Sequence, residues 1–381
     1  MSLNNFQQSK QRRNFLEKEL KVKFPQIAKA HIEEEENIYC ENLIGETTTP
    51  LGVAGPIKIQ SLQGSLKQKK DLIRQSFIPL ATTEGALVAS VNRGCKAINL
   101  SGVAKVFVKK TGTTRGPVYD TENLEKGLWF IDWLKKNEQE IKKEAEKTSS
   151  HLRYLKFYAK VVGGYTFIRF YFDCDEAMGM NMATIATEAI NRWIEKKAKI
   201  RCLSITGNFC VDKKASWLNF LLGRGQELWA EVSLKKEIIN RVLKTSGEKM
   251  FEVWLGKNLI GSILSGSISY NGHFANIVAA YFLATGQDLA HVIEGSLGIT
   301  TTKLLPNGDL YFAIYLPAVM LAMVGGGTKL KIKKEAIAIT QAKNSRELAE
   351  VLGAAVLAGE ISLLASLAEG SLARAHQKLG R

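Results

Sequence analysis

Apolar residues recur at helical spacing in the run PLATTEGALVASVNRGCKAI, which covers residues 79–98. Leu87 and Val91 fall on one face of this run, and Thr82 and Thr83 precede them as candidate N-terminal caps. The pattern therefore predicts a helix with one buried face.

Glu84 is the one carboxylate in the first turn of this predicted helix. A carboxylate there often does no more than interact favourably with the positive end of the helix dipole. Its small apolar neighbours favour a second function, because a desolvated carboxyl keeps its proton near neutral pH and can act as a general acid. The local pattern alone leaves both interpretations open.

Residues 103–205 alternate between the period of a strand and the period of a helix. The predicted elements are, in order, a strand over 103–109, a helix over 121–147, strands over 155–162 and 165–172 joined by Gly163-Gly164, a helix over 178–197 and a strand over 200–205. The order βαββαβ is that of a ferredoxin-like split sheet.

The predicted fold class is α+β, with this ferredoxin-like (βαββαβ) small domain inserted into a larger, mainly helical domain. We place an N-terminal helical segment at 1–45, the large domain at 46–109 and 208–381, and the small domain at 110–207. Within the large domain the pattern predicts helices over 220–243 and 263–285 and an apolar helix from Leu348.

The composition is that of an ordinary globular protein, since 45% of the 381 residues are hydrophobic and 23% are charged. Five cysteines with no CxxC pair argue against a disulfide framework and a zinc site, so we predict no metal. The N-terminal segment is polar, and the most apolar stretches, 312–324 and 351–367, are interrupted by Pro317 and Glu360. We therefore expect a soluble, cytoplasmic protein with no membrane span.

Lysine and arginine outnumber aspartate and glutamate by 52 to 37, which gives a formal net charge of +15. Such an excess indicates anionic partners, and nucleic acid, a membrane surface and phosphorylated cofactors all meet that description. The chain has no zinc-finger, basic-zipper or RRM signature, and its scattered lysine pairs are typical of a solvated surface. We therefore expect no nucleic-acid partner.

Two segments with glycine are candidate ligand sites. Gly179 lies in the first turn of the helix predicted over 178–197, where glycine disfavours a helix but lets a ligand approach the backbone at a helix N-terminus. The run VGGGT at 324–328 is either a turn that approaches a phosphate or a hinge. It is not a Walker motif, and the chain contains no GxGxxG sequence.

Nearly the whole chain resembles the 3-hydroxy-3-methylglutaryl-coenzyme A (HMG-CoA) reductase family. The motifs that carry the resemblance, in shared order and spacing, are ENLIG at 41–45, PLGVAGPI at 50–57, ATTEGALVAS at 81–90, NRG at 92–94, TTRGPV at 113–118, EAMGMNM at 176–182, GNFCVDKK at 207–214, GQD at 286–288, VGGGT at 324–328 and His376. The ATTEG and MGMNM variants resemble the first of the family's two classes, whose members use NADPH. The resemblance is to the soluble form that consists of the catalytic domain alone.

The resemblance implies reduction of HMG-CoA to mevalonate and free coenzyme A by two successive hydride transfers, in the mevalonate pathway of isoprenoid biosynthesis. It also implies four catalytic residues: Glu84 as the acid, with Lys213, Asp288 and His376. Each hydride leaves negative charge on a carbonyl oxygen, which an ammonium stabilises and an acid protonates. An ionised Asp288 favours a charged Lys213 and a protonated Glu84, and a histidine is suited to protonate the leaving thiolate.

The same residue-by-residue comparison implies the binding residues. Those that hold the carboxylate and hydroxyl of the substrate are Arg115, Asp212, Lys214, Lys257 and Asn276, and those that contact coenzyme A are Asn92 and Arg93. The cofactor residues are Ser149, Glu176, Met178, Gly179, Met180, Asn181, Gly325, Gly326 and Gly327. Family members are dimers with sites built between subunits, so we expect a homodimer or a higher even oligomer.

The chain departs from the family at two positions that bear on the cofactor and the site. The pair that meets the 2′-phosphate of NADPH, typically serine or threonine followed by arginine, is here Ser149-Ser150, so we expect NADPH with NADH as an alternative. His151 and Arg153 are candidates to replace the lost arginine. Met320 stands where the family has a glutamate, and the sequence offers no physical account of what replaces that carboxylate.

A non-catalytic binding function remains as an alternative. A non-catalytic descendant of the family could keep the fold and bind acyl-coenzyme A or another anionic partner through its basic surface. A chain released from catalysis would have little reason to keep four catalytic residue types together, so we favour the enzyme.

Overall fold

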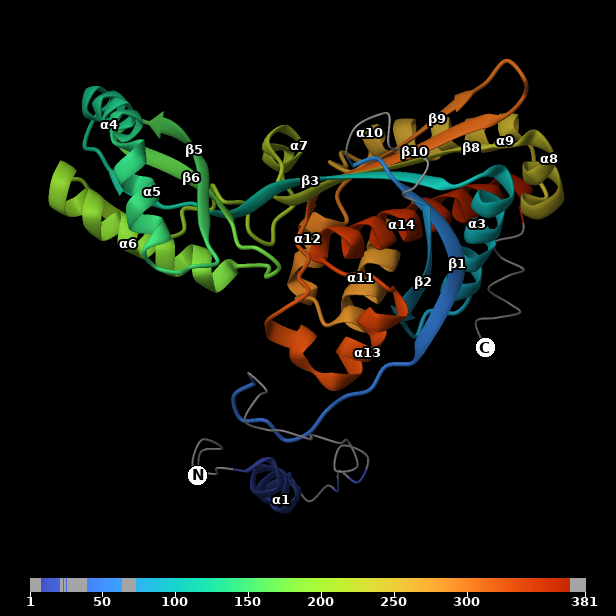
Figure 1. Cartoon of the computed structure of the whole chain (residues 1–381), viewed down its shortest axis with the longest axis horizontal. Coiled ribbons are helices and arrows are strands. Elements are labelled where there is room, and N and C mark those ends of the chain that lie inside the picture. The colour runs from blue at the N-terminus through green and yellow to red at the C-terminus, as the bar shows by residue number, and fades with distance from the viewer. Residues whose placement is uncertain (1–7, 21–22, 24, 26–39, 64–72, 371–381) are drawn as a thin grey trace.

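The computed structural model describes residues 8–20, 23, 25, 40–63 and 73–370. The molecule is a mixed α and β structure with two units along its longest axis (Figure 1). A single long strand, β3 (Ala104–Arg115), runs from one unit into the other. Its first residues pair with β1 and β8, and its last residues, 113–115, pair with β6.

The larger unit is built on a mainly antiparallel sheet. Its strands are, in order, β2 (Ile73–Ala81), β1 (Leu51–Ser61), β3, β8 (Gly225–Leu234), β10 (Leu310–Val319) and β9 (Ile299–Leu304). The neighbours β1 and β3 pair in parallel over residues 59–61 and 104–106. Along β8 the buried side chains of Leu228, Ala230 and Val232 face the core and alternate with the more exposed Trp229, Glu231 and Ser233, as the two-residue period of a strand requires.

A helix that is buried on nearly all sides, α14 (Ser345–Glu369), lies against this sheet (Figure 1). Asn344 caps its start, because its side chain accepts a hydrogen bond from the backbone N of Glu347. By length and composition α14 could cross a membrane, but 83% of its most apolar window is buried inside the protein. The prediction that this apolar stretch is a buried helix is confirmed.

The helix α3 (Leu87–Ser101) crosses α14 in very close contact. A Cβ atom on Gly94 would lie 1.9 Å from the carbonyl oxygen of Ala358, so only glycine allows this approach. Beside the crossing, the Arg93 guanidinium donates a hydrogen bond to the Ser362 carbonyl at 2.6 Å. The contact joins the β1–β2 side of the sheet to the core.

The helix α11 (Phe274–Thr285) runs antiparallel to α14 in the core. Near the end of α11, the Tyr281 hydroxyl donates to the carbonyl oxygen of Leu348 at 3.0 Å. Just before its start, the backbone N of His273 donates to the buried carboxylate of Glu360 at 2.7 Å. Both ends of α11 are therefore held by residues of α14.

The smaller unit has its own sheet and its own core. Its strands are ordered β7 (Arg201–Ser204), β4 (Val118–Asp120), β6 (Tyr165–Asp173) and β5 (Arg153–Val162), and its helices are α4 (Leu124–Lys136), α5 (Glu138–Glu146) and α6 (Met180–Ala198). The buried residues Phe130, Ile168, Phe170 and Ile190 belong to a hydrophobic cluster separate from that of the larger unit. Each unit thus buries its own apolar residues.

The remaining helical elements are short and lie mostly at the edges of the larger unit. They are α1 (Ser9–Leu20), α7 (Trp217–Leu222), α8 (Lys236–Ile238), η4 (Ile239–Leu243), α9 (Gly247–Val253), η5 (Trp254–Gly261), α10 (Ser262–Leu264), η6 (Leu289–His291), α12 (Val292–Gly295), η7 (Gly326–Lys329) and α13 (Lys331–Ile339).

The helix predicted within 79–98 is confirmed as α3, with Leu87 and Val91 on its buried face. Two details of the larger unit are wrong. The predicted start after the candidate caps Thr82 and Thr83 is wrong, because residues 79–81 end β2, Ala86 has a left-handed φ of 72° and α3 begins only at Leu87. Glu84 therefore lies in the turn before the helix, and its interpretation as a charge inside the first turn is wrong. The helix predicted over 220–243 is interrupted by β8, whose run QELWAEVSL follows the strand period.

Other predicted elements of the chain hold with altered bounds. The helix predicted over 121–147 is divided into α4 and α5 at Asn137. The two strands and hairpin predicted over 155–172 are confirmed as β5 and β6. The helix predicted over 263–285 is divided, because a loop separates α10 from α11.

Gly94→Ala is expected to lower the free energy of unfolding by about 3 kcal/mol or more, because the added Cβ meets backbone that cannot rotate away. Gly256→Ala is the matched control: it lies in η5, and a Cβ there would meet nothing within 4 Å. That variant should be unchanged or more stable by about 0.5–1 kcal/mol. Urea unfolding of both variants checks this, and equal stabilities would contradict the close α3–α14 contact.

Candidate active site

An ion pair joins two of the predicted catalytic residues. Nζ of Lys213 lies 2.9 Å from Oδ2 of Asp288. The other carboxylate oxygen of Asp288, Oδ1, accepts a hydrogen bond from the backbone N of Ala290 at 3.0 Å and so caps η6. One carboxylate oxygen of Asp288 is thus fixed by the backbone N–H of Ala290, while the other faces Lys213.

Opposing effects act on the pKa of Asp288. Burial raises it, whereas the hydrogen bond from Lys213, the Ala290 amide, and the neighbouring His291 and Lys213 lower it. The net pKa of Asp288 lies below its ordinary value, so the carboxyl is ionised at neutral pH. An ionised carboxylate is therefore held against the Lys213 side chain.

Lys213 lies on a strained loop between β7 and α7. Three residues of this loop with a Cβ, Asn208, Val211 and Lys213, have φ values of 61°, 54° and 57°. Such left-handed backbone costs about 1–2 kcal/mol per residue, so surrounding contacts must hold the loop in place. One such contact is the hydrogen bond from the backbone N of Lys213 to Oε1 of Glu294, at 3.3 Å.

A buried cluster of charges lies behind the ion pair, with Arg224 at its centre. The guanidinium of Arg224 is completely buried; it lies 2.9 Å from Oδ1 of Asp212 and forms an ion pair with Glu294. Oδ2 of Asp212 lies 3.7 Å from Arg115. Nδ1 of His291 lies 2.6 Å from Oε1 of Glu294. Because each charge has a partner of opposite sign, the cluster can stay ionised in the interior.

Three residues of this cluster are of types that can bind a metal ion. Among the residues that the structure describes, Asp212, His291 and Glu294 form the one group whose ligand atoms lie within 4.8 Å of one another. The guanidinium of Arg224 forms ion pairs with both of these carboxylates. It already supplies the positive charge that a metal ion would bring, so the arrangement gives no support for a metal site.

A second group of predicted site residues gathers at the start of α11. Oε1 of Glu84 accepts a hydrogen bond from Nδ2 of Asn276 at 3.1 Å. Lys257 donates to the carbonyl oxygen of Gly272 at 3.4 Å, just before the helix begins. The buried carboxylate of Glu360 accepts hydrogen bonds from the backbone N of Gly272 at 2.9 Å and from Thr300 at 2.7 Å. This carboxylate holds the backbone that positions Asn276.

The two groups lie at opposite ends of α11. The helix has 12 residues, and at about 1.5 Å per residue it is roughly 18 Å long. Asn276 lies in its first turn, whereas Asp288 follows its last residue. Within one chain, the structure therefore brings Lys213 to Asp288 but leaves Glu84 at the far end of the helix. The fourth predicted residue, His376, lies outside the described residues.

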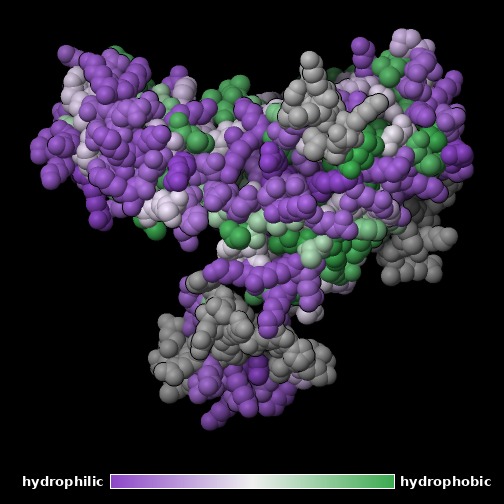
Figure 2. Space-filling view, viewed as in Figure 1, coloured by the Kyte–Doolittle hydropathy of each residue, from purple (hydrophilic) through white to green (hydrophobic). Residues whose placement is uncertain are grey.

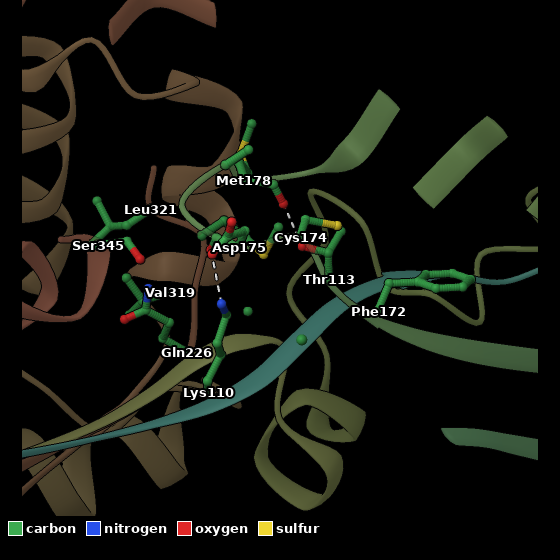
Figure 3. A pocket seen from close by; sticks show the side chains of 14 residues that line it. Lys110, Thr113, Phe172, Cys174, Asp175, Met178, Gln226, Val319, Leu321 and Ser345 are labelled. Atoms are coloured by element: carbon green, nitrogen blue, oxygen red, sulfur yellow. Dashed lines mark hydrogen bonds between the residues drawn. The ribbon is translucent and has the colours of Figure 1, made fainter. Parts of the chain in front are cut away.

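The predicted cofactor residues line the boundary between the two units. Gly179 precedes α6 with a φ of 84°, and a Cβ there would lie 2.2 Å from Sγ of Cys174. The carbonyl oxygen of Met178 accepts a hydrogen bond from the Thr113 hydroxyl (Figure 3). Thr113, Cys174 and Met178 border a small pocket, which is also lined by Met320. Met320, which stands where the family has a glutamate, thus lies beside the predicted cofactor loop.

The glycine run of η7 connects the predicted cofactor loop to the Asp288 turn. The backbone N of Met323, just before the run, donates to the carbonyl oxygen of Glu176 at 2.9 Å. At its other end, Gly327 packs against Gly286, where an added Cβ would lie 2.7 Å from backbone. Gly325 and Gly326 have positive φ, and an added Cβ would meet nothing within 4 Å. A ligand can therefore approach this backbone closely.

The remaining predicted residues have contacts of their own or face solvent. Of the predicted coenzyme A residues, Asn92 accepts a hydrogen bond from the backbone N of Gly55 at 3.0 Å, and Arg93 lies 3.9 Å from Glu369. Of the predicted cofactor residues, the Ser149 hydroxyl lies 3.7 Å from Sδ of Met182, Glu176 accepts a hydrogen bond from the backbone N of Ser345 at 2.5 Å, and Sδ of Met180 lies 3.1 Å from Arg224. Of the predicted substrate residues, Arg115 donates to the Thr184 hydroxyl at 3.0 Å, and Lys214 is exposed.

Sequence reasoning missed three members of the buried cluster: Arg224, His291 and Glu294. A signal for two of them was present in the run DLAHVIE, where Asp288, His291 and Glu294 are spaced three residues apart. Residues at that spacing lie on one face of a 3₁₀ or α-helical turn. Nothing in the sequence indicated Arg224, which directly precedes β8 and reaches the cluster from there.

Comparison with known proteins identifies the family. The profile described as hydroxymethylglutaryl-coenzyme A reductase matches residues 8–381. The chain is 44% identical to the 3-hydroxy-3-methylglutaryl-coenzyme A reductase of Methanocaldococcus jannaschii, over 97% of this chain and 92% of that protein. It is 42% identical to the reductase of Pyrococcus abyssi over the same shares of the two chains.

Solved structures support the fold. The class II 3-hydroxy-3-methylglutaryl-CoA reductase from Streptococcus pneumoniae, bound to NADPH in open conformations, has a TM-score of 0.70 with 17% sequence identity. The match covers 96% of this chain and 100% of that one. The likeness confirms the mixed α and β architecture with its large antiparallel sheet.

Asp288→Asn should cost about 0.2–1 kcal/mol of stability at neutral pH, because the pair with Lys213 is partly exposed and the amide keeps the η6 cap. The folded pKa of Asp288 is lowered, so its contribution is fully present above about pH 4, the ordinary range of the unfolded side chain. It is lost as the pH falls through the folded pKa. Urea unfolding from neutral to acidic pH should show the two proteins converging, and a difference independent of pH would contradict the ionised pair.

Proposed function

The chain belongs to the hydroxymethylglutaryl-coenzyme A reductase family, and we propose that it reduces HMG-CoA to mevalonate and free coenzyme A with hydrides from NADPH. The reaction belongs to the mevalonate pathway of isoprenoid biosynthesis. The observation that carries the proposal is the Lys213–Asp288 ion pair, at 2.9 Å. A fixed ammonium beside an ionised carboxylate suits the reduction of a carbonyl group, because it can stabilise the negative charge that develops on the oxygen.

Each proposed catalytic residue answers one need of the reaction. NADPH, when bound, supplies a hydride with its two electrons to the carbonyl carbon. Lys213 stabilises the negative charge that then develops on the carbonyl oxygen, and Asp288 orients Lys213. Glu84 donates the proton that converts this oxygen to a hydroxyl. His376 protonates the thiolate of coenzyme A as it leaves.

A homodimer, or a higher even oligomer built from such dimers, is part of the proposal. Glu84 and Lys213 lie at opposite ends of α11 and cannot reach one carbonyl group within a single chain. In a two-fold symmetric dimer, the Glu84 end of one chain can face the Lys213 end of its partner, and symmetry repeats the contact to form two complete sites. The separation of the two groups along α11 supports this assembly.

Exposed apolar side chains flank both groups. Leu51 and Val53 on β1 are 46% and 45% exposed, and Leu289 and Ile293 beside Asp288 are 47% and 48% exposed. Figure 2 shows apolar side chains gathered on the face of the larger unit where β2, α11 and α12 lie in Figure 1. Apolar patches of this kind are typical of surfaces covered by another chain.

The smaller unit is proposed to be a ferredoxin-like cofactor domain at 110–207, inserted into a substrate domain at 46–109 and 208–381, with an N-terminal segment at 1–45. The strand order β7-β4-β6-β5, with two crossing helical connections, supports this topology. The separate hydrophobic clusters support the division.

The residues present fit a dinucleotide cofactor. The start of α6 has no side-chain cap, so its backbone N–H groups are available to an anion. We propose that Met178, Gly179, Met180 and Asn181 hold the nicotinamide dinucleotide there, with Glu176, Ser149 and the glycines Gly325, Gly326 and Gly327 beside it. His151, which lies 3.4 Å from Asp175 in an exposed position, and Arg153 are the side chains proposed to contact the 2′-phosphate of NADPH. NADH remains the alternative cofactor.

The proposed substrate residues divide between the two groups. Arg115, Asp212 and Lys214 lie with Lys213, and Lys257 and Asn276 lie with Glu84. A substrate that spans both groups would therefore be held by two chains. Asn92 and Arg93 are proposed to contact coenzyme A from α3.

The proposal includes a cytoplasmic location without a membrane or nucleic-acid partner. It is supported by the burial of α14, which is the one described helix long and apolar enough to cross a membrane.

Purified protein is expected to oxidise two NADPH for each HMG-CoA, with release of one free thiol. Lys213→Ala should fold normally and abolish turnover, because the developing oxyanion loses its cation. Lys303→Ala, which removes an exposed lysine on β9, is the control and should keep full activity. Absorbance of the reduced nicotinamide and a thiol assay measure both products. No oxidation of either NADPH or NADH by the unmodified protein would overturn the proposal.

Mixing two inactive variants tests the shared site. Glu84→Gln and Lys213→Ala should each be inactive as homodimers, whereas a heterodimer of the two contains one site with both residues intact. Random exchange of subunits in an equal mixture should therefore restore about a quarter of the unmodified activity. If the mixture stays inactive after subunit exchange is verified by mass spectrometry, the two residues act within one chain.

A further inference from the structure

His291 and Glu294 have no role in the steps above, although they lie directly behind the Lys213–Asp288 ion pair. Both side chains are completely shielded from solvent. Nδ1 of His291 lies 2.6 Å from Oε1 of Glu294, and Nε2 lies 3.5 Å from Oδ2 of Asp288. That Asp288 oxygen is the same one that lies 2.9 Å from Nζ of Lys213. His291 thus stands between a buried carboxylate and the catalytic pair.

Both ring nitrogens of His291 face carboxylate oxygens. An ionised carboxylate only accepts hydrogen bonds, and a neutral imidazole has a single N–H to donate. If that proton serves the short contact with Glu294, Nε2 presents a lone pair to Asp288. Nε2 has no hydrogen-bond partner among the residues that the structure describes. The imidazolium form, with an N–H on each nitrogen, is the form that suits both neighbours.

The charges around His291 also favour the imidazolium. Three carboxylates face the ring: Glu294 and Asp288 from its own segment, and Asp212, whose Oδ1 lies 3.8 Å from Nδ1, from the Lys213 loop. Two like charges oppose them: NH1 of Arg224 lies 3.4 Å from Nδ1, and the Lys213 ammonium is paired with the same Asp288 oxygen that faces Nε2. Three negative neighbours are thus set against two positive ones.

We propose that His291, held by Glu294, is a positioning residue for Asp288 and that its protonated form is the active one. The inference rests on the proposed function of Lys213 and Asp288. In the protonated form, Nε2–H of His291 and the Lys213 ammonium share Oδ2 of Asp288. The carboxylate is fixed from two sides, and the ammonium is free to turn toward the carbonyl oxygen as negative charge develops there.

Loss of the proton from His291 reverses both effects. The positive charge behind the site disappears, and the lone pair of Nε2 repels Oδ2 of Asp288. Turnover should therefore fall as rising pH removes this proton. Because His291 does not contact the substrate, the change should affect kcat and leave KM for the substrate unaltered.

Two amide substitutions separate the roles of the two ring nitrogens. In His291→Asn the side-chain amide nitrogen takes the place of Nδ1, so the hydrogen-bond donor to Glu294 is kept. In His291→Gln the side-chain amide nitrogen takes the place of Nε2, so the hydrogen-bond donor to Asp288 is kept. Reduction of mevaldehyde is the reaction to measure, because it has no thiolate for His376 to protonate. Circular dichroism and the melting temperature establish that both variants fold.

The expected pH profiles differ between the three proteins. The unmodified protein should lose kcat as the pH rises from neutral to alkaline values. His291→Gln should keep most of the kcat measured at neutral pH without this decline. His291→Asn should lose about 10–100-fold in kcat, less than the ~10²–10⁴-fold that a direct proton donor contributes, also without the decline. A merely structural role would instead leave the decline in place in both folded variants.

Nuclear magnetic resonance provides a readout that needs no turnover. The Cε1–H signal of His291, assigned by its absence in His291→Gln, is followed as the pH is changed. In Asp288→Asn its titration midpoint should move to lower pH by about 1–3 units, because a facing carboxylate is lost. Glu350→Gln is the control: Glu350 is also a carboxylate paired with a cation, 3.0 Å from Arg74, but it belongs to α14, and the midpoint should not move.

Either of two results would overturn the proposal: a midpoint that does not move in Asp288→Asn, or the same decline of kcat with pH in both folded His291 variants as in the unmodified protein. Failure of the unmodified protein to reduce HMG-CoA would be a different result. It would overturn the proposed function, and the titration of His291 would still report on the Asp288 contact.

Discussion

The length and direction of α11 are the constraint on which the rest of the site depends. The helix is buried against α14 and held at both ends, by Glu360 at its start and by the Gly286–Gly327 contact after its end. It keeps the Glu84–Asn276 group about 18 Å from the Lys213–Asp288 group. This separation is the observation on which the proposed assembly of each site from two chains rests.

Buried carboxylates position both halves, and each has several polar partners. Glu360 accepts backbone and hydroxyl hydrogen bonds at the start of α11, and Glu294 holds Arg224, His291 and the Lys213 backbone behind the ion pair. A buried charge without partners would cost several kcal/mol, and here every such charge has them. The electrostatic arrangement of the site is therefore set largely by buried residues behind the ion pair and at the start of α11.

Local pattern predicted the hairpin and the helices of the smaller unit but not its first strand: the strand predicted over 103–109 belongs to β3 in the larger sheet, and β4 takes its place. The hairpin of β5 and β6 follows the two-residue period around Gly163-Gly164, so the sequence indicates it directly. The run at 225–234 also has that period, but its apolar character resembles a buried helix, and tertiary pairing with β3 and β10 decides the outcome. The Lys213–Asp288 contact joins distant segments, so only the family resemblance could indicate it. Glu84 was expected beside that pair, and no periodicity could have indicated that α11 separates them.

Specific activity measured as the protein is diluted tests the central claim most directly, which is that each active site is shared by two chains. Sedimentation at each concentration gives the fraction of chains in dimers, and NADPH oxidation with HMG-CoA gives the activity per chain. The account predicts that activity falls in proportion to the dimer fraction and returns when the sample is concentrated again. Dissociated chains that keep full activity would contradict it.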